Sequence, residues 1–252
     1  MKIEQNRTIG LFDIAPDSTL KLESMARFFQ DMAIGHSSQV GAGPDELFSR
    51  GVVWFLHRLE IEVLRYPVFG ETVNISTWSR GFRHHMGLRE YSIESDQGLA
   101  VKASSVWIFF DFRKKRVVRV PSDIEALYQF EPQKNFETEL SNWNPSSGVE
   151  PEQEIDISLR YGDFDINHHV NNTIYPGFIE TLFHNTLSRG GEKIQHMKLR
   201  FGREIPQGKT SVRCGWQTMK PTGRPMDDKA YKFVVIDPKD SSCPYADGEF
   251  LF

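Results

Sequence analysis

The feature that most constrains the fold is a pattern that occurs twice along the chain: an apolar stripe at helical spacing, followed by several extended runs rich in β-forming residues. In the first half, the stripe consists of Met25, Phe28, Phe29 and Met32. Asp17-Ser18-Thr19 is typical of a helix start, and Gly41 and Gly43, followed by Pro44, are typical of a helix end. The extended runs are 52–63, 72–78, 88–94 and 101–112, and residues 96–98 favour a hairpin turn between the last two.

The second half repeats this order of elements. A short strand is expected at 155–160, and a polar loop follows it. A second helix is predicted to begin near Pro176 and to end at Arg189-Gly190-Gly191; its apolar stripe is Ile174, Phe178, Ile179, Leu182 and Phe183. Strands are expected at 193–201, 210–219, 229–236 and 245–252. The two halves share the order of their predicted elements but not their residue identities, and this shared order indicates a duplicated unit. An α+β architecture, with one helix packed on each antiparallel sheet, would bury both stripes.

The chain of 252 residues also divides by composition. Residues 131–152 are rich in Asn, Ser, Pro and Glu, without sustained periodicity, and read as a linker. We therefore expect one domain at 1–130 and another at 153–252, each of ordinary domain size.

Composition excludes several classes of protein. Hydrophobic residues make up 39% of the chain and charged residues 25%, which argues against a disordered protein. The net charge of −4 argues against nucleic-acid binding through a uniformly basic surface. No apolar run approaches the roughly 20 residues that span a bilayer, and the first ten residues are polar, so we expect a soluble cytoplasmic protein without a membrane span. Two cysteines, Cys214 and Cys243, are too few for a zinc ribbon.

The most informative segment is the polar loop at 163–172. It holds two carboxylates, three amides and two imidazoles, interleaved with Phe164, Ile166 and Val170. One interpretation is a solvated turn that caps the following helix. The other is a partly buried loop, in which polar side chains pair with one another or with a ligand. Alternation in an extended segment would place Asp163, Asp165, Asn167 and His169 on one side, a credible hydrolytic group.

Two further motifs have a structural and a functional interpretation. His84-His85 could suggest a metal site, but adjacent strand residues point to opposite faces and no acidic or cysteine cluster lies nearby, so we expect no metal there. Arg113-Lys114-Lys115-Arg116, followed by Arg119, is a strongly basic segment. It is either a hairpin tip whose charges aid solubility or a docking patch for an acidic partner.

The loop resembles the Asp-x-Asp-x-Asn-x-His-Val-Asn-Asn signature of the acyl-acyl carrier protein thioesterases, a family with two hotdog folds in one chain. The resemblance covers nearly the whole chain. Residues 22–41 resemble the first hotdog helix, and Trp54-Phe55-Leu56-His57-Arg58 with Arg65-Tyr66-Pro67 resembles the strands after it. Asn171-Asn172-Thr173-Ile174-Tyr175 runs into the second helix, and Phe201-Gly202-Arg203-Glu204 resembles the later Arg-Glu pair.

The resemblance implies a catalytic site of Asp165, Asn167, His169 and Glu204. Asn167 and His169 would face the thioester, Asp165 would orient them, and Glu204 would polarise the attacking water. A second scheme makes Asp165 the nucleophile, through an acyl-enzyme anhydride, and both schemes stay open. Certain plant members have a cysteine after this glutamate, but Ile205 stands here, which excludes a Cys-His mechanism at this place. Cys214 is predicted to be a core residue. For Glu204, the alternative to a catalytic role is a surface ion pair with Arg200 or Arg203.

The resemblance further implies that the first hotdog houses the acyl chain, in a pocket lined by Met25, Phe29, Met32 and Trp54. The expected activity is hydrolysis of fatty acyl-acyl carrier protein, without cofactor or metal. The acidic acyl carrier protein would dock on Arg113, Lys114, Lys115 and Arg116. Hydrolysis of acyl-coenzyme A and a catalytically silent acyl-binding module are the alternatives, and a homodimer is an open question.

Overall fold

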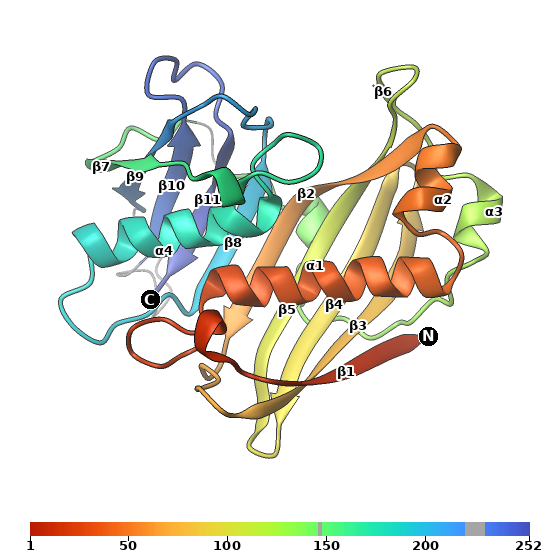
Figure 1. The fold of residues 1–252 in the computed structure, drawn as a ribbon, viewed down its shortest axis with the longest axis horizontal. Helices are drawn as coiled ribbons and strands as arrows, with labels where there is room; N and C mark the ends of the chain where they lie inside the picture. Colours follow the sequence, from red (N-terminus) through yellow and green to blue (C-terminus); the bar gives the residue numbers. More distant parts are fainter. Residues whose placement is uncertain (146–147, 220–229) are drawn as a thin grey trace. The chain divides into compact units, whose positions relative to one another are not determined.

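The computed structural model describes residues 1–145, 148–219 and 230–252, which form two compact units, Met1–Trp143 and Asn144–Phe252 (Figure 1). The boundary between the units falls inside the segment 131–152, which we predicted as a linker. Residues 146–147 of that segment, and Lys229 at the start of a predicted strand, lie outside the described residues.

The first unit is an antiparallel sheet with a long helix across one face (Figure 1). Its strands are β1 (Lys2–Thr8), β2 (Val52–Val63), β3 (Thr72–Arg83), β4 (Met86–Ser95), β5 (Gly98–Asp111) and the short β6 (Arg116–Val117). They pair in the order β1-β3-β4-β5-β2, and β6 pairs with the end of β5. Its helical elements are η1 (Leu11–Asp13), α1 (Leu22–Gln39), α2 (Pro44–Ser49), α3 (Ser122–Glu125) and η2 (Leu140–Asn142).

The second unit repeats this design. Its strands are β7 (Gln153–Ser158), β8 (His196–Phe201), β9 (Ser211–Thr218), β10 (Ala230–Ile236) and β11 (Ala246–Leu251), in the order β8-β11-β10-β9-β7. Its helical elements are η3 (Tyr161–Asp163), η4 (Asn172–Ile174) and α4 (Tyr175–Thr186). A helix lies on each antiparallel sheet (Figure 1), so the predicted α+β class and the duplicated unit are confirmed, and each unit has the hotdog arrangement.

The apolar stripes are buried as predicted. In α1, the side chains of Met25, Phe28, Phe29 and Met32 are 4% exposed or less, and the stripe of α4 is buried in the same way at Phe178, Ile179, Leu182 and Phe183. Burial of such large side chains is the main favourable term that holds each helix on its sheet.

Three local predictions need correction. The α1 helix begins at Leu22 and not at Asp17, whose carboxylate instead accepts hydrogen bonds from the backbone N–H and hydroxyl of Thr19 in a turn. Pro44 was expected only to follow the end of a helix, but it is the first residue of the short helix α2. A proline at this position costs no hydrogen bond. Strand β1 was not predicted because it is an edge strand, largely exposed and therefore polar.

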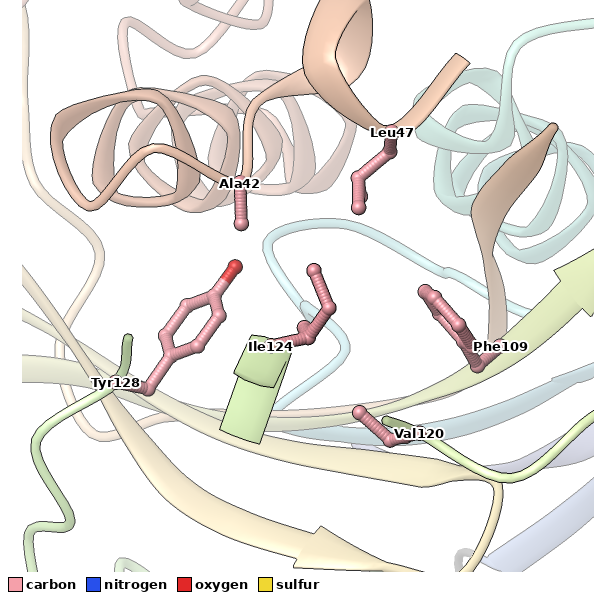
Figure 2. Close-up of a cluster of buried hydrophobic side chains, with 6 residues drawn as sticks. All are labelled: Ala42, Leu47, Phe109, Val120, Ile124 and Tyr128. Carbon is pink, nitrogen blue, oxygen red and sulfur yellow. The ribbon is translucent and has the colours of Figure 1, made fainter. Parts of the chain in front are cut away.

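A small apolar cluster fixes α2 and α3 to the end of the sheet. Its members are Ala42, Leu47, Phe109, Val120, Ile124 and Tyr128, whose side chains point toward one another (Figure 2). The partly buried side chains of Trp54 and Phe82 pack against this cluster. In the described part of the chain, none of the helices is long and apolar enough to cross a membrane.

Candidate active site

The polar loop of the second unit is anchored by Asp163. This side chain is buried, and its carboxylate accepts the backbone N–H of Arg160 at 2.8 Å and two guanidinium N–H groups of Arg160 at 2.7 and 3.0 Å. Asp163 ends the 3-10 turn η3, so the segment is not extended here. The prediction that Asp163 shares a face with Asp165, Asn167 and His169 by strand alternation is therefore wrong, and Asp163 has a structural role.

A tight turn follows at residues 165–168. The N–H of His168 donates to the carbonyl of Asp165 at 3.0 Å, and the N–H of Asp165 donates to the carbonyl of His169 at 2.9 Å. His168 has a φ of 63°, in the left-handed region, which lets the chain reverse. Phe164 and Val170 form a β-bridge below the turn, and Val170 is buried. The apolar residues thus fix the loop, as the partly buried interpretation requires.

Asp165 holds Asn167 at the surface of this turn. Oδ1 of Asp165 accepts the backbone N–H of Asn167 at 2.8 Å, and Oδ2 lies 3.5 Å from the Asn167 amide nitrogen. Asp165 is half-buried, and Asn167 is exposed. The amide can therefore meet a ligand while the carboxylate restrains it.

The loop is joined to the segment after β8 by backbone contacts that bring His169 and Glu204 together. The N–H of Val170 donates to the carbonyl of Ile205 at 3.0 Å, and His169 and Pro206 form a β-bridge. As a result, Nε2 of His169 lies 3.2 Å from Oε2 of Glu204. The side chains are 33% and 54% exposed, so water and a ligand can reach this pair.

The alternative surface pairs of Glu204 are not formed with its neighbouring arginines. Arg200 pairs with Asp247 through two hydrogen bonds of 2.8 and 2.5 Å, and Arg203 Nη1 lies 4.0 Å from the carboxylate of Asp240. Glu204 therefore faces His169 without competition from these two cations.

Two residues near the pair had no catalytic signal in the sequence. Oε1 of Gln207 accepts a hydrogen bond from Nδ1 of His168 at 2.8 Å, which joins the tip of the loop to the segment that carries Glu204. Tyr175 is buried at the start of α4; burial raises the pKa of its hydroxyl above the usual value, and the nearby Tyr245 and Glu204 act in the same direction. Tyr175 was visible only as the end of the Asn171–Tyr175 motif.

The first unit contains the same loop without the same side chains. Residues 9–20 and 159–170 have matching secondary structure, and the six backbone hydrogen bonds that define the loop recur at equivalent positions. Residues 150 positions apart correspond in the loop, so the residues of the first unit that match Asp165, Asn167 and His169 are Ala15, Asp17 and Thr19. The hydrogen bond from the N–H of Leu20 to the carbonyl of Pro67 corresponds to that from Val170 to Ile205. Tyr66 therefore occupies, in the first unit, the position that Glu204 has in the second. The candidate group of four thus exists in the second unit only.

The residues predicted to bind the acyl chain lie in the interior of the first unit. Met25, Phe29 and Met32 are buried on α1, and the Phe29 ring lies 4.8 Å from that of Tyr91. Trp54 is half-buried and packs against Phe109, with ring centroids 4.6 Å apart, beside the cluster in Figure 2.

The basic segment forms the tip of the β5–β6 hairpin, as predicted. Arg113, Lys114, Lys115 and Arg116 are all exposed, and Lys115 turns the chain with a φ of 52°. Arg113 donates to the carbonyl of Ser49 at 2.9 Å, and Lys114 lies 3.4 Å from the carboxylate of Asp111.

Cys214 is a core residue of β9, as predicted, and burial raises the pKa of its thiol well above the usual range. His84 and His85 lie in the turn between β3 and β4 and not within a strand, so the argument from opposite strand faces does not apply to them. Within residues 1–145, 148–219 and 230–252, no group of three or more His, Cys, Asp or Glu side chains is placed to hold a metal ion.

Comparison with known proteins assigns both halves to related models. The acyl-ACP thioesterase N-terminal domain matches residues 1–128, and the acyl-ACP thioesterase C-terminal domain matches residues 146–220. A chloroplastic palmitoyl-acyl carrier protein thioesterase of Cuphea hookeriana is 26% identical over 235 residues, or 87% of this chain and 55% of that protein. An oleoyl-acyl carrier protein thioesterase of Arabidopsis thaliana is 26% identical over 71% of this chain and 54% of that protein. The chain spans about half the length of these curated relatives.

Solved structures share the fold over the whole chain. An acyl-ACP thioesterase from Bacteroides thetaiotaomicron superimposes with a TM-score of 0.83 and 18% identity, covering 100% of this chain and 97% of that one. A 12:0-ACP thioesterase from Umbellularia californica gives a TM-score of 0.79 and 18% identity, covering 99% and 96%. At this identity the likeness establishes the tandem hotdog fold.

Proposed function

Because this chain belongs to the acyl-ACP thioesterase family, we propose that it hydrolyses the thioester of fatty acyl-acyl carrier protein and releases free fatty acid and holo-acyl carrier protein. The observation that carries this proposal is the contact of 3.2 Å between His169 Nε2 and Glu204 Oε2, beside the exposed amide of Asn167. A carboxylate, an imidazole and an amide on one accessible surface are suited to thioester hydrolysis.

In the proposed reaction, water attacks the carbonyl carbon of the thioester while Glu204 accepts a proton from that water. Negative charge develops on the carbonyl oxygen, where the Asn167 amide and a ring N–H of His169 donate hydrogen bonds. The carbon–sulfur bond then breaks, the carrier leaves as a thiolate, and the thiolate takes up the proton that Glu204 accepted from water, which restores the carboxylate. Because a thiolate is a good leaving group, the step needs no strong acid.

Asp165 is proposed to orient Asn167. Both of its oxygens face the backbone and side-chain nitrogens of Asn167, at 2.8 and 3.5 Å, and this supports orientation over nucleophilic attack. In the scheme with an anhydride intermediate, Asp165 would have to leave these partners to reach the thioester.

The first unit is proposed to house the acyl chain, and the second to carry the catalytic residues. The buried methionines Met25 and Met32 support this division, because flexible thioether side chains adapt to a hydrocarbon guest. Phe29 and Trp54 are proposed as further wall residues. The absence of the group of four from the loop at 9–20 is the second support.

The carrier is proposed to dock on Arg113, Lys114, Lys115 and Arg116, since exposed positive charge attracts an acidic protein and speeds its encounter. A homodimer and a cytoplasmic location stay predictions from the sequence.

The experiment that tests the function compares turnover of the same acyl group on acyl carrier protein and on coenzyme A. We expect a higher kcat/KM with acyl carrier protein. A clear preference for coenzyme A would overturn the proposed substrate, and no turnover of either thioester would overturn the proposed reaction. Analysis of the fatty acids released in a bacterial expression host would then define the chain length.

A further inference from the structure

Two phenylalanines form an exposed aromatic pair next to the basic hairpin. Phe48, the fifth residue of α2, stacks on Phe112, the residue directly after β5, with ring centroids 4.9 Å apart and planes at 27°. Phe48 is 64% exposed, and Phe112 is half-buried. Two large apolar rings stacked at the surface expose apolar area to water. Burial of these rings in an interface would be favourable.

The pair stands on a rigid base. Leu47, directly before Phe48, is 3% exposed and belongs to the apolar cluster in Figure 2, together with Phe109 from β5. The N–H of Phe112 donates to the carbonyl of Gly51 at 3.1 Å. The backbone that carries each ring is therefore anchored, and binding to the rings would require little ordering of that backbone.

Exposed positive side chains lie beside the pair on the hairpin that follows Phe112, although Asp45 and Glu46 are also exposed in the first turn of α2. Arg113 lies directly over Gly51, where an added Cβ would come within 2.5 Å of its Nε, and it donates to the carbonyl of Ser49 at 2.9 Å. Figure 1 shows α2 and the hairpin that carries β6 at one end of the first unit. Within the described residues, Lys115, Arg116 and Arg119 form no ion pair with an acidic side chain, so their charge is available to a partner.

We propose that the Phe48–Phe112 pair is the apolar anchor of the surface on which the acyl carrier protein docks, with the hairpin residues Arg113 to Arg116 as its charged rim. The inference rests on the proposed function and extends it: charge alone would steer the carrier, whereas the aromatic pair would hold it. Aromatic side chains are enriched at the centres of protein interfaces, and polar and charged side chains form their rims. The matching partner surface is acidic, with apolar side chains between its carboxylates.

Charge complementarity selects this occupant over a second copy of the chain. Self-association through this end of the molecule would bring two basic hairpins together, which is unfavourable. An acidic carrier could instead pack apolar side chains on the two rings and pair its carboxylates with the positive side chains of the rim.

The test uses the full-length protein with Phe48→Ser and Phe48→Glu. Phe48 is exposed, so neither change should affect folding. Phe69→Ser and Phe69→Glu are matched controls, because Phe69 is 54% exposed and lies beyond the far end of β2. A strand of this length spans about 40 Å. Each variant is assayed for kcat and KM with acyl carrier protein and coenzyme A carrying one acyl group, and for binding to holo-acyl carrier protein without an acyl chain.

We expect Phe48→Ser to raise KM for the acyl carrier protein substrate and Kd for holo-acyl carrier protein by about tenfold, the scale of one hot-spot side chain. Phe48→Glu should raise both further, because it repels an acidic partner. The kcat, the turnover of acyl-coenzyme A and both Phe69 variants should stay at wild-type values. Unchanged binding of holo-acyl carrier protein, or an equal loss on both substrates, would overturn the inference. Because this binding needs no turnover, it separates failure of the docking surface from failure of the proposed reaction.

Discussion

Asp165 of the second unit and Ala15 of the first occupy the same position in two loops with the same backbone hydrogen bonds. His168 and Ser18 match in the same way, with φ angles of 63° and 67°. The loop backbone is thus a common feature of both units, and it forms with either set of side chains. The carboxylate at position 165 is not needed to form the loop, and this separates its role from that of Asp163.

Asp165→Ala should lower kcat by at least about a hundredfold, the scale of a positioned catalytic group. The fold should survive, because Ala15 supports the same turn in the first unit. Turnover of acyl-acyl carrier protein and circular dichroism measure the two effects. Asp17→Asn, in the matching loop, is the control and should keep its activity; near-normal turnover of Asp165→Ala would refute the assignment.

Asp163→Ala should lower the free energy of unfolding by about 2 kcal/mol, because a buried carboxylate with three hydrogen bonds is lost. Urea denaturation checks this value against Asp165→Ala, which should change it by less than about 1 kcal/mol. Equal stability of the two variants would show that Asp163 does not anchor the loop.

Glu204→Gln should lower kcat by about a hundredfold or more and leave KM little changed, because the amide keeps the shape but cannot accept the proton from water. Steady-state kinetics on acyl-acyl carrier protein measure the split. Glu137→Gln, at a fully exposed site in the first unit, is the matched control. A loss confined to KM would assign Glu204 to substrate binding.

Glu90 in β4 should make the protein less stable as pH rises toward neutrality. Burial raises the pKa of Glu90 to about 7 from its ordinary value of 4.5, and hydrogen bonds from Ser104 and Asn135, with the charge of Arg80, offset this only in part. The folded state therefore keeps a proton that the unfolded chain releases, and the free energy of unfolding falls between about pH 4.5 and 7.

Glu90→Gln keeps an acceptor for Ser104 and removes this titration. At pH 8 the variant should be more stable than the wild type by about 3 kcal/mol, and below pH 4.5 the difference should vanish. Denaturant melts at several pH values measure both slopes. A variant that keeps the wild-type slope would place the titrating group elsewhere.

Reversal of the hairpin charges in Lys115→Glu/Arg116→Glu should lower kcat/KM on acyl-acyl carrier protein by about tenfold or more at low salt, and the loss should shrink as salt increases. Acyl-coenzyme A turnover at several salt concentrations is the reference. A loss that does not depend on salt would argue against electrostatic docking.

The two long helices, most strands and the duplication could be predicted from the sequence, whereas the short helices α2 and α3 could not. Their signals are local: the α1 stripe at Met25 to Met32 is periodic, and β2 was predicted at the bounds that the structure has. The motif around Asp165 to His169 was equally visible, since its residues are close in sequence.

No local pattern in the sequence predicts that His169 and Glu204 meet: the family resemblance implied it, and the packing of the chain brings it about. Glu204 is 35 positions from His169, and backbone contacts such as that between Val170 and Ile205 bring them to 3.2 Å. Phe48 and Phe112 are also distant in sequence: they come from α2 and from the turn after β5, and they stack at the surface. Periodicity reports which face of an element is buried, but contacts between distant elements depend on how the chain packs, and no local pattern records that.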